Sequence, residues 1–316
     1  MKILISGAYN ADLVGRIQQI ALSCPEQKLE TTFATSHDEL LTAVEDAEIL
    51  VPAFDRELFL KGRKLKWVQV FSAGVDMYLF PEFIESDVVL TSAKGIVGIH
   101  LAEHAFGLLL GLTRGIAAAA QHRTWGGYSH QTQELYGKVM GIIGLGGAGR
   151  EIAARADAFG MKVLALDFND VPKPDFIEEI WKPEQLPRLL RESDAVMIGL
   201  PLTTQTHGLF NRDLFQQMKR TAYLINVTRG KIMDMDSLIE ALEKGWIAGA
   251  GLDVVPEEPL PPSNPLWRME NVIITPHSAG GSPMRSQRSW ELFLDNLNRW
   301  VKGEPLLSMF NRTQEF

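Results

Sequence analysis

The sequence predicts an α/β protein built from two doubly wound parallel-sheet domains with a cleft between them. Three observations support this fold class. Apolar runs of strand length alternate with helical segments from one end of the chain to the other. A length of 316 residues corresponds to roughly two domains of about 150 residues each. A glycine-rich turn between a strand and a helix lies near the middle of the chain, where a second, more regular series of strands begins.

Residues 1–99 are expected to form the smaller domain. Its first strand is the apolar run at the N-terminus, and further strand-length runs follow at residues 48–51, 68–70 and 88–90. Between them, Ser36 and Glu39 have the spacing of a capping box. The helix that this box opens would carry on one face Leu40, Leu41 and Val44.

Residues 100–287 are expected to form the second domain. Its buried-strand patterns lie at residues 139–143, 163–166, 195–199, 222–225, 248–252 and 272–274. Helical segments separate them, as at residues 236–244. Helix-forming sequence at both junctions, residues 100–120 and 282–301, predicts that the chain crosses over and returns. Residues 288–316 should therefore rejoin the first domain.

Charge and composition exclude several classes of protein. The formal net charge is −8 and the pI is near 5.5, so a nucleic-acid partner is not expected. Cys24 is the only cysteine, which excludes an intrachain disulfide and fits a reducing compartment. The most apolar stretch, residues 101–120, is interrupted by charged and histidine side chains, and the N-terminal run is too short for a signal peptide. We expect a soluble, cytoplasmic protein without a membrane partner or a metal site.

The central glycine-rich turn is Gly144-Leu145-Gly146-Gly147-Ala148-Gly149, which fits the pattern G-x-G-x-x-G. It follows an apolar strand and opens a helix, which is the context of a dinucleotide-binding turn. Gly144 permits the tight turn, Gly146 lets the backbone approach a pyrophosphate, and Gly149 lets the helix pack close to the strand. The N–H groups at the start of that helix would face the phosphates.

The next strand ends at Asp167, 23 residues after Gly144. Its carboxylate is placed to accept hydrogen bonds from the hydroxyls of an adenosine ribose. A 2′-phosphate would meet this carboxylate and that of Asp170, and the four residues after Asp167 include no arginine or lysine. We therefore expect NAD(H) to be preferred over NADP(H).

Three later strand ends carry polar side chains, and the carboxyl ends of parallel strands line a ligand crevice. Arg229 follows one strand, and its planar guanidinium could hold a carboxylate together with an adjacent carbonyl oxygen. Residues 253–259 form an acidic segment with two prolines after the next strand, and His277 follows the last one. Each feature alone has a structural explanation, as an ion pair, a loop or a buried histidine. Together they predict a catalytic site.

These motifs resemble those of the D-isomer-specific 2-hydroxyacid dehydrogenases, which include glyoxylate and hydroxypyruvate reductases, D-lactate dehydrogenase and phosphoglycerate dehydrogenase. The resemblance rests on Gly144 to Gly149, Arg229-Gly230, the segment 253–259 and Pro276-His277. It extends along the chain to residues 71–76, 101–105, 200–203 with Thr206, and 264–267. It implies two Rossmann-like domains and hydride transfer between NAD(H) and C2 of a small D-2-hydroxy acid or 2-oxo acid.

The resemblance also implies the catalytic roles. Arg229 would bind the substrate carboxylate and polarise the 2-oxo group, and His277 would be the general acid–base. The family's glutamate lies five residues after its aspartate and just before a proline, which selects Glu258 rather than Glu257. Glu258 would orient the ring of His277 and favour its protonated form.

Binding roles follow in the same way. Backbone N–H groups of Ala73 and Gly74 would bind the substrate carboxylate from the small domain. Asp253 would face the nicotinamide carboxamide, Leu200 and Pro201 would flank the adenine, and Thr206 would lie near the phosphates. The remaining cofactor contacts would come from Val227, Thr228 and Gly280.

Some positions depart from the family pattern and leave the substrate pocket open: Met77, Thr228 and Ser278. The particular 2-oxo acid and the physiological direction are therefore not determined. A phosphite dehydrogenase would share the Arg–Glu–His set, and an NAD(H)-sensing corepressor would keep it in a non-enzymatic scaffold. A formate dehydrogenase would carry glutamine in place of Glu258, and a long phosphoglycerate dehydrogenase would need a further domain.

A homodimer through the cofactor domain is the expected assembly. Residues 117–137 contain Trp125, Tyr128 and Tyr136 among polar residues, and this stretch is long and aromatic for a connector. In the family that this chain resembles, the equivalent region embraces a second subunit. His100, His104 and Trp125 are interpreted as packing residues or contacts of this arm.

Overall fold

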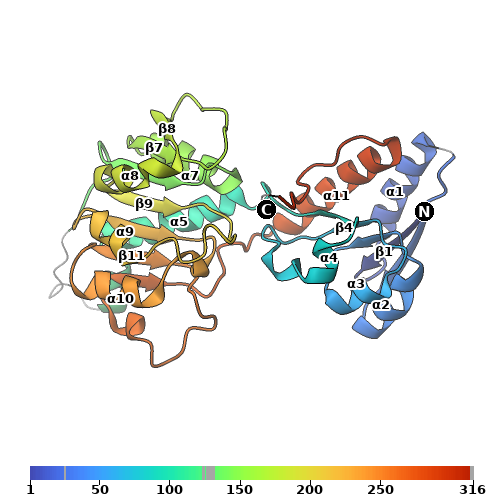
Figure 1. The fold of residues 1–316 in the computed structure, drawn as a ribbon, viewed down its shortest axis with the longest axis horizontal. Helices are drawn as coiled ribbons and strands as arrows, with labels where there is room; N and C mark the ends of the chain where they lie inside the picture. Colours follow the sequence, from blue (N-terminus) through green and yellow to red (C-terminus); the bar gives the residue numbers. More distant parts are fainter. Residues whose placement is uncertain (25, 123–124, 126–131, 314–316) are drawn as a thin grey trace. The chain divides into compact units, whose positions relative to one another are not determined.

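The computed structural model describes residues 1–24, 26–122, 125 and 132–313. The chain forms two compact units, drawn in Figure 1. Unit 1 comprises Met1–Ile96 and Ser282–Phe316, and unit 2 comprises Val97–Gly281. The chain thus passes from one unit to the other after Ile96 and after Gly281, a few residues before the expected boundaries after residues 99 and 287.

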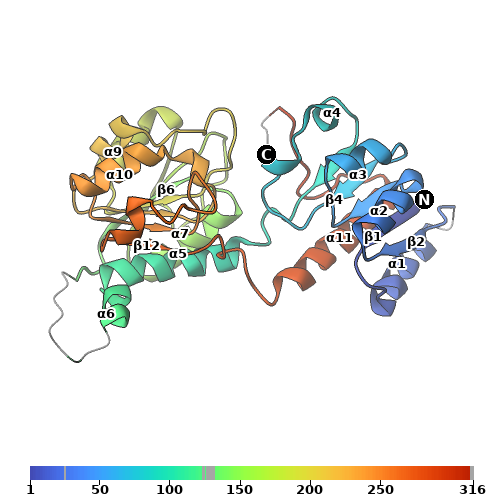
Figure 2. The same cartoon turned by 90° about the horizontal axis from the view of Figure 1, so that it is seen from below.

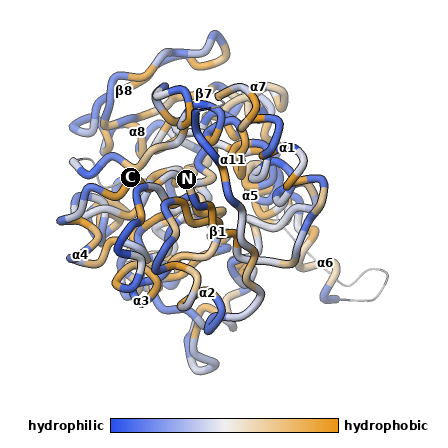
Figure 3. Tube along the Cα trace, turned by 90° about the vertical axis from the view of Figure 1, so that its right-hand side faces the viewer, coloured by the Kyte–Doolittle hydropathy of each residue, from blue (hydrophilic) through white to orange (hydrophobic). Residues whose placement is uncertain are grey.

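The sheet of unit 1 has five parallel strands in the order β2-β1-β3-β4-β5. Their bounds are β1 Lys2–Ser6, β2 Glu30–Ala34, β3 Ile49–Val51, β4 Trp67–Gln69 and β5 Val89–Thr91. This order is that of flavodoxin-like folds. The sequence did not predict β2, because it is an edge strand whose burial alternates and whose residues include two threonines. The tube at β1 has hydrophobic colours, as expected for a strand buried on both faces (Figure 3).

The helices of unit 1 include one from the far end of the chain. They are α1 Ala11–Ser23, α2 His37–Ala43, α3 Arg56–Lys61, α4 Pro81–Ile84 and α11 Arg285–Lys302. The predicted capping box is present, since Ser36 accepts from the N–H of Glu39 and Glu39 bonds back. Phe293 of α11 stacks on Trp67 of β4 with ring centroids 5.6 Å apart. The C-terminal helix therefore completes the core of unit 1.

The sheet of unit 2 has seven parallel strands in the order β12-β11-β10-β9-β6-β7-β8. Their bounds are β6 Val139–Ile143, β7 Lys162–Leu166, β8 Glu179–Trp181, β9 Ala195–Ile198, β10 Tyr223–Asn226, β11 Gly249–Leu252 and β12 Val272–Ile274. The strand order reverses beside β6, which has β7 on one side and β9 on the other. This is the switch point at which doubly wound sheets bind nucleotides. The edge strand β8 was not predicted.

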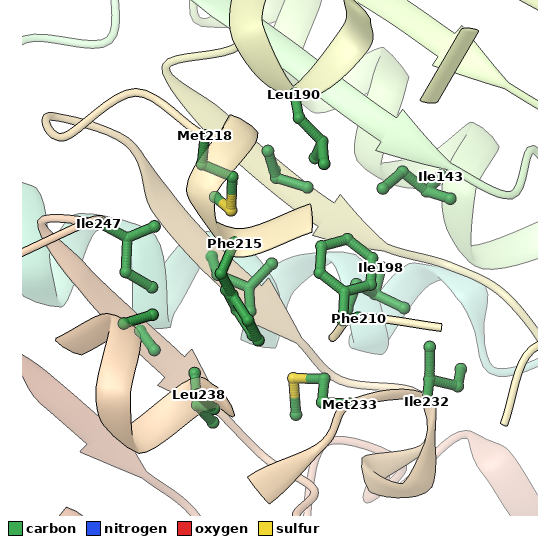
Figure 4. Packing of buried hydrophobic residues seen from close by; sticks show 14 of the residues in the cluster. Ile143, Leu190, Ile198, Phe210, Phe215, Met218, Ile232, Met233, Leu238 and Ile247 are labelled. Carbon is green, nitrogen blue, oxygen red and sulfur yellow. The ribbon is translucent and has the colours of Figure 1, made fainter. Parts of the chain in front are cut away.

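Helices cover both faces of this sheet. On one face lie α5 Gly98–Thr113 and α7 Gly147–Ala158, and on the other lie α8 Leu186–Glu192, α9 Arg212–Gln217 and α10 Met235–Glu243 (Figure 2). Strand side chains alternate between two cores, so Ile142 packs toward α5 and α7 whereas Ile143 packs toward α8 (Figure 4). Burial on both faces explains the continuous apolar runs of the sequence.

The helical segment expected at residues 100–120 is two helices. Between α5 and α6 Ile116–His122, Gly115 adopts a left-handed backbone with φ 65°. A residue with a Cβ would be strained in this conformation, so the helix ends there. Within the described residues, no helix is long and apolar enough to cross a membrane.

The predicted fold class is confirmed: both sheets are parallel, and α-helices connect most of the successive strands. Short 3₁₀ segments lie in the loops of both units. They are η1 Val44–Asp46, η2 Asp76–Tyr78, η3 Pro183–Gln185, η4 Gly230–Ile232 and η5 Pro265–Arg268.

Candidate active site

The candidate residues of unit 2 all follow the carboxyl ends of strands. The glycine turn from Gly144 follows β6, and Asp167 follows β7. The residues after β9 are Leu200, Pro201 and Thr206, and the others follow β10, β11 and β12. Because these strands are parallel, their carboxyl ends lie along one edge of the sheet. That edge is the candidate site.

The glycine turn after β6 has the geometry that a pyrophosphate requires. Gly144 has φ 95°, and a Cβ added there would lie 2.8 Å from the carbonyl of Gly199. A Cβ on Gly149 would lie 2.0 Å from the oxygen of Gly144, so the helix α7 could not approach β6 so closely with any other residue. A Cβ on Gly146, the N-cap of α7, would meet nothing within 4 Å. The open space beside Gly146 and the N–H groups of Gly147 and Ala148 fit an anionic phosphate.

The carboxylate of Asp167 connects two loops. Its Oδ2 accepts the backbone N–H of Leu145 at 2.7 Å, and its Oδ1 accepts that of Asn169 at 2.8 Å. Its side chain is largely buried at the end of β7. Asp167 therefore ties the glycine turn to the next strand, a role that the sequence argument did not include.

Two cationic side chains, those of Lys182 and Arg150, contact the loop after β7. Neither follows Asp167 closely in the sequence. Lys182 Nζ is 2.5 Å from Asp170 Oδ1, and this hydrogen bond holds the pKa of Asp170 below its usual value. Arg150 of α7 donates to the carbonyl of Pro172 at 2.9 Å. The four residues after Asp167 include no arginine or lysine, as expected, but helix and strand packing brings these two cations from other parts of the chain.

Arg229 is held by a tightly bonded turn after β10. Asn226 Nδ2 donates to the carbonyl of Arg229 at 2.9 Å, and Asn226 Oδ1 accepts the N–H of Thr228 at 3.0 Å. The side chain of Val227 is buried. A Cβ on Gly230 would lie 2.0 Å from the carbonyl of Val255, which shows how closely this turn packs on the segment after β11.

His277 and Glu258, which the sequence pairs, are in contact. Nδ1 of His277 is 2.7 Å from Oε2 of Glu258. The other carboxylate oxygen, Oε1, accepts the backbone N–H of Val255 at 3.1 Å. Half of the His277 side chain is exposed, so the ring is both oriented and accessible. Glu257 is exposed, and the carboxylate that contacts the ring is that of Glu258.

Asp253 and Thr206 have protein partners that sequence reasoning missed. Asp253 is 2% exposed, and its carboxylate accepts hydrogen bonds from Thr275, Ser278 and Ala279. The hydroxyl of Thr206 donates to the carbonyl of Pro201 at 2.7 Å, within its own loop. Both side chains shape the loops that surround the site. Their contacts with a cofactor stay predictions, as do those of Leu200 and Gly280.

The histidine His104 of α5 also reaches this edge of the sheet. Its Nε2 lies 2.8 Å from Oγ1 of Thr275, the residue after β12. The interpretation of His104 as a packing residue is therefore incomplete. No local sequence signal identifies this contact, because it depends on how α5 packs across the sheet.

Ala73 and Gly74 lie in unit 1, in the loop between β4 and η2. The carbonyl of the preceding Ser72 accepts the N–H of Ala93 at 2.9 Å. The carbonyl of Phe71 accepts from Arg285 at 2.9 Å. The loop is thus anchored at its start. The role of Ala73 and Gly74 in binding the substrate carboxylate stays a prediction.

Comparison with known proteins identifies the family. The model of the D-isomer specific 2-hydroxyacid dehydrogenase, NAD binding domain, matches residues 106–279. Glyoxylate reductase from Thermofilum pendens is 35% identical over 297 residues, which cover 88% of this chain and 85% of that protein.

Two solved structures are similar over nearly the whole chain. A D-isomer specific 2-hydroxyacid dehydrogenase family protein from Aeromonas salmonicida has 30% identity and a TM-score of 0.79, covering 98% of this chain and 99% of that one. A D-isomer specific 2-hydroxyacid dehydrogenase from Xanthobacter autotrophicus, solved with NADPH and MES, has 27% identity and a TM-score of 0.78, covering 100% and 99%. With the site described above, these matches show that the chain belongs to the D-isomer-specific 2-hydroxyacid dehydrogenase family.

Proposed function

We propose that this 2-hydroxyacid dehydrogenase reduces a small 2-oxo acid, of the size of glyoxylate or hydroxypyruvate, to the D-2-hydroxy acid with NADH. The observation that carries the proposal is the 2.7 Å hydrogen bond between His277 and Glu258, at the same edge of the sheet as a glycine turn that fits a dinucleotide. The name of the Thermofilum relative, a glyoxylate reductase, supports a substrate of this size.

The proton comes from His277 in this mechanism. Its Nδ1 is bonded to Glu258, so Nε2 is the ring nitrogen that protonates the carbonyl oxygen of the substrate. The carboxylate of Glu258 fixes the orientation of the ring. NADH, when bound, would supply the hydride that C2 receives, so that with the proton from His277 the C=O group would become H–C–OH.

Arg229 is the residue that binds the carboxylate of the substrate in this proposal. Its guanidinium can bond a carboxylate and the adjacent 2-oxo oxygen together, and the positive charge polarises the carbonyl. The turn fixes the backbone to which the guanidinium is attached, and Nη1 of Arg229 donates to the carbonyl of Thr228 at 2.9 Å. The backbone N–H groups of Ala73 and Gly74 are proposed to bond the same carboxylate.

We propose NADH as the preferred cofactor. The turn from Gly144 to Gly149 would bind the pyrophosphate, and Asp167 would bond the adenosine ribose. Leu200 and Pro201 would flank the adenine. The other contacts are proposed for Thr206, Val227, Thr228, Asp253 and Gly280.

A panel of 2-oxo acids with NADH tests the function, with turnover followed as loss of absorbance at the nicotinamide band. We expect turnover with at least one small 2-oxo acid, and its loss in His277→Asn, while Glu257→Gln serves as the control. Phosphite with NAD⁺ is a second arm. Turnover of phosphite alone, or NADH binding without any turnover, would overturn the proposal in favour of a phosphite dehydrogenase or a scaffold.

A further inference from the structure

The backbone of His277 has a conformation that few residues with a Cβ adopt. Its φ is 51°, in the left-handed region. Such a conformation costs free energy and persists only where the surroundings impose it. The catalytic ring is attached to this residue, so whatever imposes the conformation also aims the ring.

Asp253 imposes it through three consecutive N–H groups. Its backbone carbonyl accepts the N–H of His277 at 2.8 Å. Its carboxylate accepts the N–H of Ser278 on Oδ1 and that of Ala279 on Oδ2, both at 2.9 Å. The loop after β12 is therefore wrapped around the end of β11. Its shape depends on where the carboxylate of Asp253 lies.

That carboxylate is oriented by a hydroxyl and a histidine. Thr275 donates its hydroxyl hydrogen to Oδ1 of Asp253 at 2.6 Å. With its hydrogen used there, Oγ1 of Thr275 accepts from Nε2 of His104 at 2.8 Å, so this nitrogen carries a hydrogen. Nε2 also lies 3.4 Å from Oδ1 of Asp253. Asp253 is 2% exposed, so water gives it little help.

We propose that His104 is a positioning residue for the acid–base His277, acting from helix α5 through Thr275 and Asp253. The proposal rests on the proposed function, in which His277 donates the proton. Glu258 orients the ring of His277. The hydrogen bonds from His104 through Thr275 to Asp253 hold the backbone of His277 in its conformation. A histidine that only filled space in α5 would not need a hydrogen-bonded partner at the end of β12.

Variants of His104 and Thr275 test this proposal. His104→Leu removes the donor, His104→Gln keeps an N–H donor, and Thr275→Val removes the hydroxyl with little change of shape. The matched control is Thr113→Val, on the same helix, which removes a buried hydroxyl that donates to the helix's own carbonyl of Leu109 at 2.9 Å. Measurements are kcat, KM for the 2-oxo acid, and the Kd of NADH.

We expect kcat to fall about 10- to 100-fold in His104→Leu and in Thr275→Val, since small displacements of a catalytic group cost this much. The Kd of NADH should rise by a smaller factor than kcat falls, because the glycine turn and Asp167 are not part of this hydrogen-bond chain, and His104→Gln should recover most of kcat. The double variant, His104→Leu with Thr275→Val, should have a kcat no lower than that of the slower single variant, because both residues act through the carboxylate of Asp253. Thr113→Val should keep its kcat.

A kcat within about twofold of wild type in Thr275→Val, or effects that multiply in the double variant, would overturn the proposal. Should His104→Leu not fold, Thr275→Val and His104→Gln carry the test. A crystal structure of Thr275→Val gives a readout without activity: we expect residue 277 to leave the left-handed region or to lose its contact with Glu258. An unchanged loop after β12 would contradict the proposal. Wild-type protein inactive on every 2-oxo acid would instead refute the proposed function, while the structural readout would still judge this inference.

Discussion

Oε2 of Glu258 lies 2.7 Å from Nδ1 of His277, although 19 positions separate the two residues and each follows a different strand. The contact leaves Nε2 as the nitrogen that can face a substrate. It also fixes the orientation of the ring, because the other carboxylate oxygen of Glu258 accepts the backbone N–H of Val255 at 3.1 Å.

The first prediction concerns this pair. His277→Ala should lower kcat by about 10²–10⁴-fold and leave NADH binding nearly unchanged, because general acid–base help has this size. Glu258→Gln should lower kcat by about 10- to 100-fold, because an amide holds the orientation of the ring less well than the carboxylate that now contacts Nδ1. Glu257→Gln should keep the wild-type kcat, and an unchanged kcat in Glu258→Gln would mean that Glu258 is not the partner.

The second prediction is cofactor selectivity. A 2′-phosphate at Asp167 would lose the ribose bond and bring like charges together, so wild type should prefer NADH in kcat/KM by roughly a hundredfold. The double change Asp167→Ala with Phe168→Arg should erode or reverse this preference, chiefly through KM for the cofactor. It should also weaken NADH binding, because the bond to Leu145 is lost.

The control for selectivity is Asp170→Asn. Since Asp170 is already paired with Lys182, its loss should change the ratio of kcat/KM for NADH and NADPH little. Equal efficiency of wild type with both cofactors would contradict the second prediction. Lys182 and Arg150 would then be the cations that accept the phosphate.

The third prediction concerns stability at Gly230. An added Cβ would overlap the carbonyl of Val255, so Gly230→Ala should lower the free energy of unfolding by about 1–3 kcal/mol. It should also lower kcat/KM, because Arg229 precedes it in the same turn. Gly107→Ala is the matched control in unit 2: its Cβ would meet nothing within 4 Å on helix α5. It should stabilise by about 0.5–1 kcal/mol. Urea unfolding followed by circular dichroism gives both values, and equal effects would refute the close packing at Gly230.

The fourth prediction is a homodimer through residues 117–137. Tyr128 and most of residues 123–131 lie outside the described part of the chain, so the prediction rests on the flanking residues. The side chains of Trp125 and Tyr136 are fully and 79% exposed, respectively, and exposed aromatic side chains are typical of interfaces. Tyr136 also lines a hollow of about 380 Å³ with Leu110, Arg114, Glu134, Leu135 and Phe159.

Sedimentation at micromolar concentration tests the assembly. We expect a species of twice the protomer mass, and a 35.2 kDa species would rule the dimer out. Trp125→Glu should weaken the dimer. Leu22→Glu, at an exposed apolar residue of unit 1, should leave it intact.

Local patterns in the sequence were enough for the fold class and most strands. A strand buried on both faces needs an unbroken apolar run, and a dinucleotide turn needs glycines at three set positions, so both are readable from neighbouring residues. Arg229, Glu258 and His277 could be selected for the same reason, because each directly follows a strand or stands at a fixed offset from one. The edge strands β2 and β8 were missed, since partly exposed strands carry no such run.

Contacts between distant segments were decided only by the tertiary structure. The order of strands in the sheet places Asp253, Thr275 and His277 side by side, and the packing of α5 brings His104 to them. The same packing brings Lys182 and Arg150 to the loop after Asp167, which changes the charge argument for the cofactor. Residue types and short spacings are properties of the chain, so the sequence by itself determined which groups are available. Which of them meet depends on hydrogen bonds and core packing between elements far apart in the chain, and these exist only once it has folded.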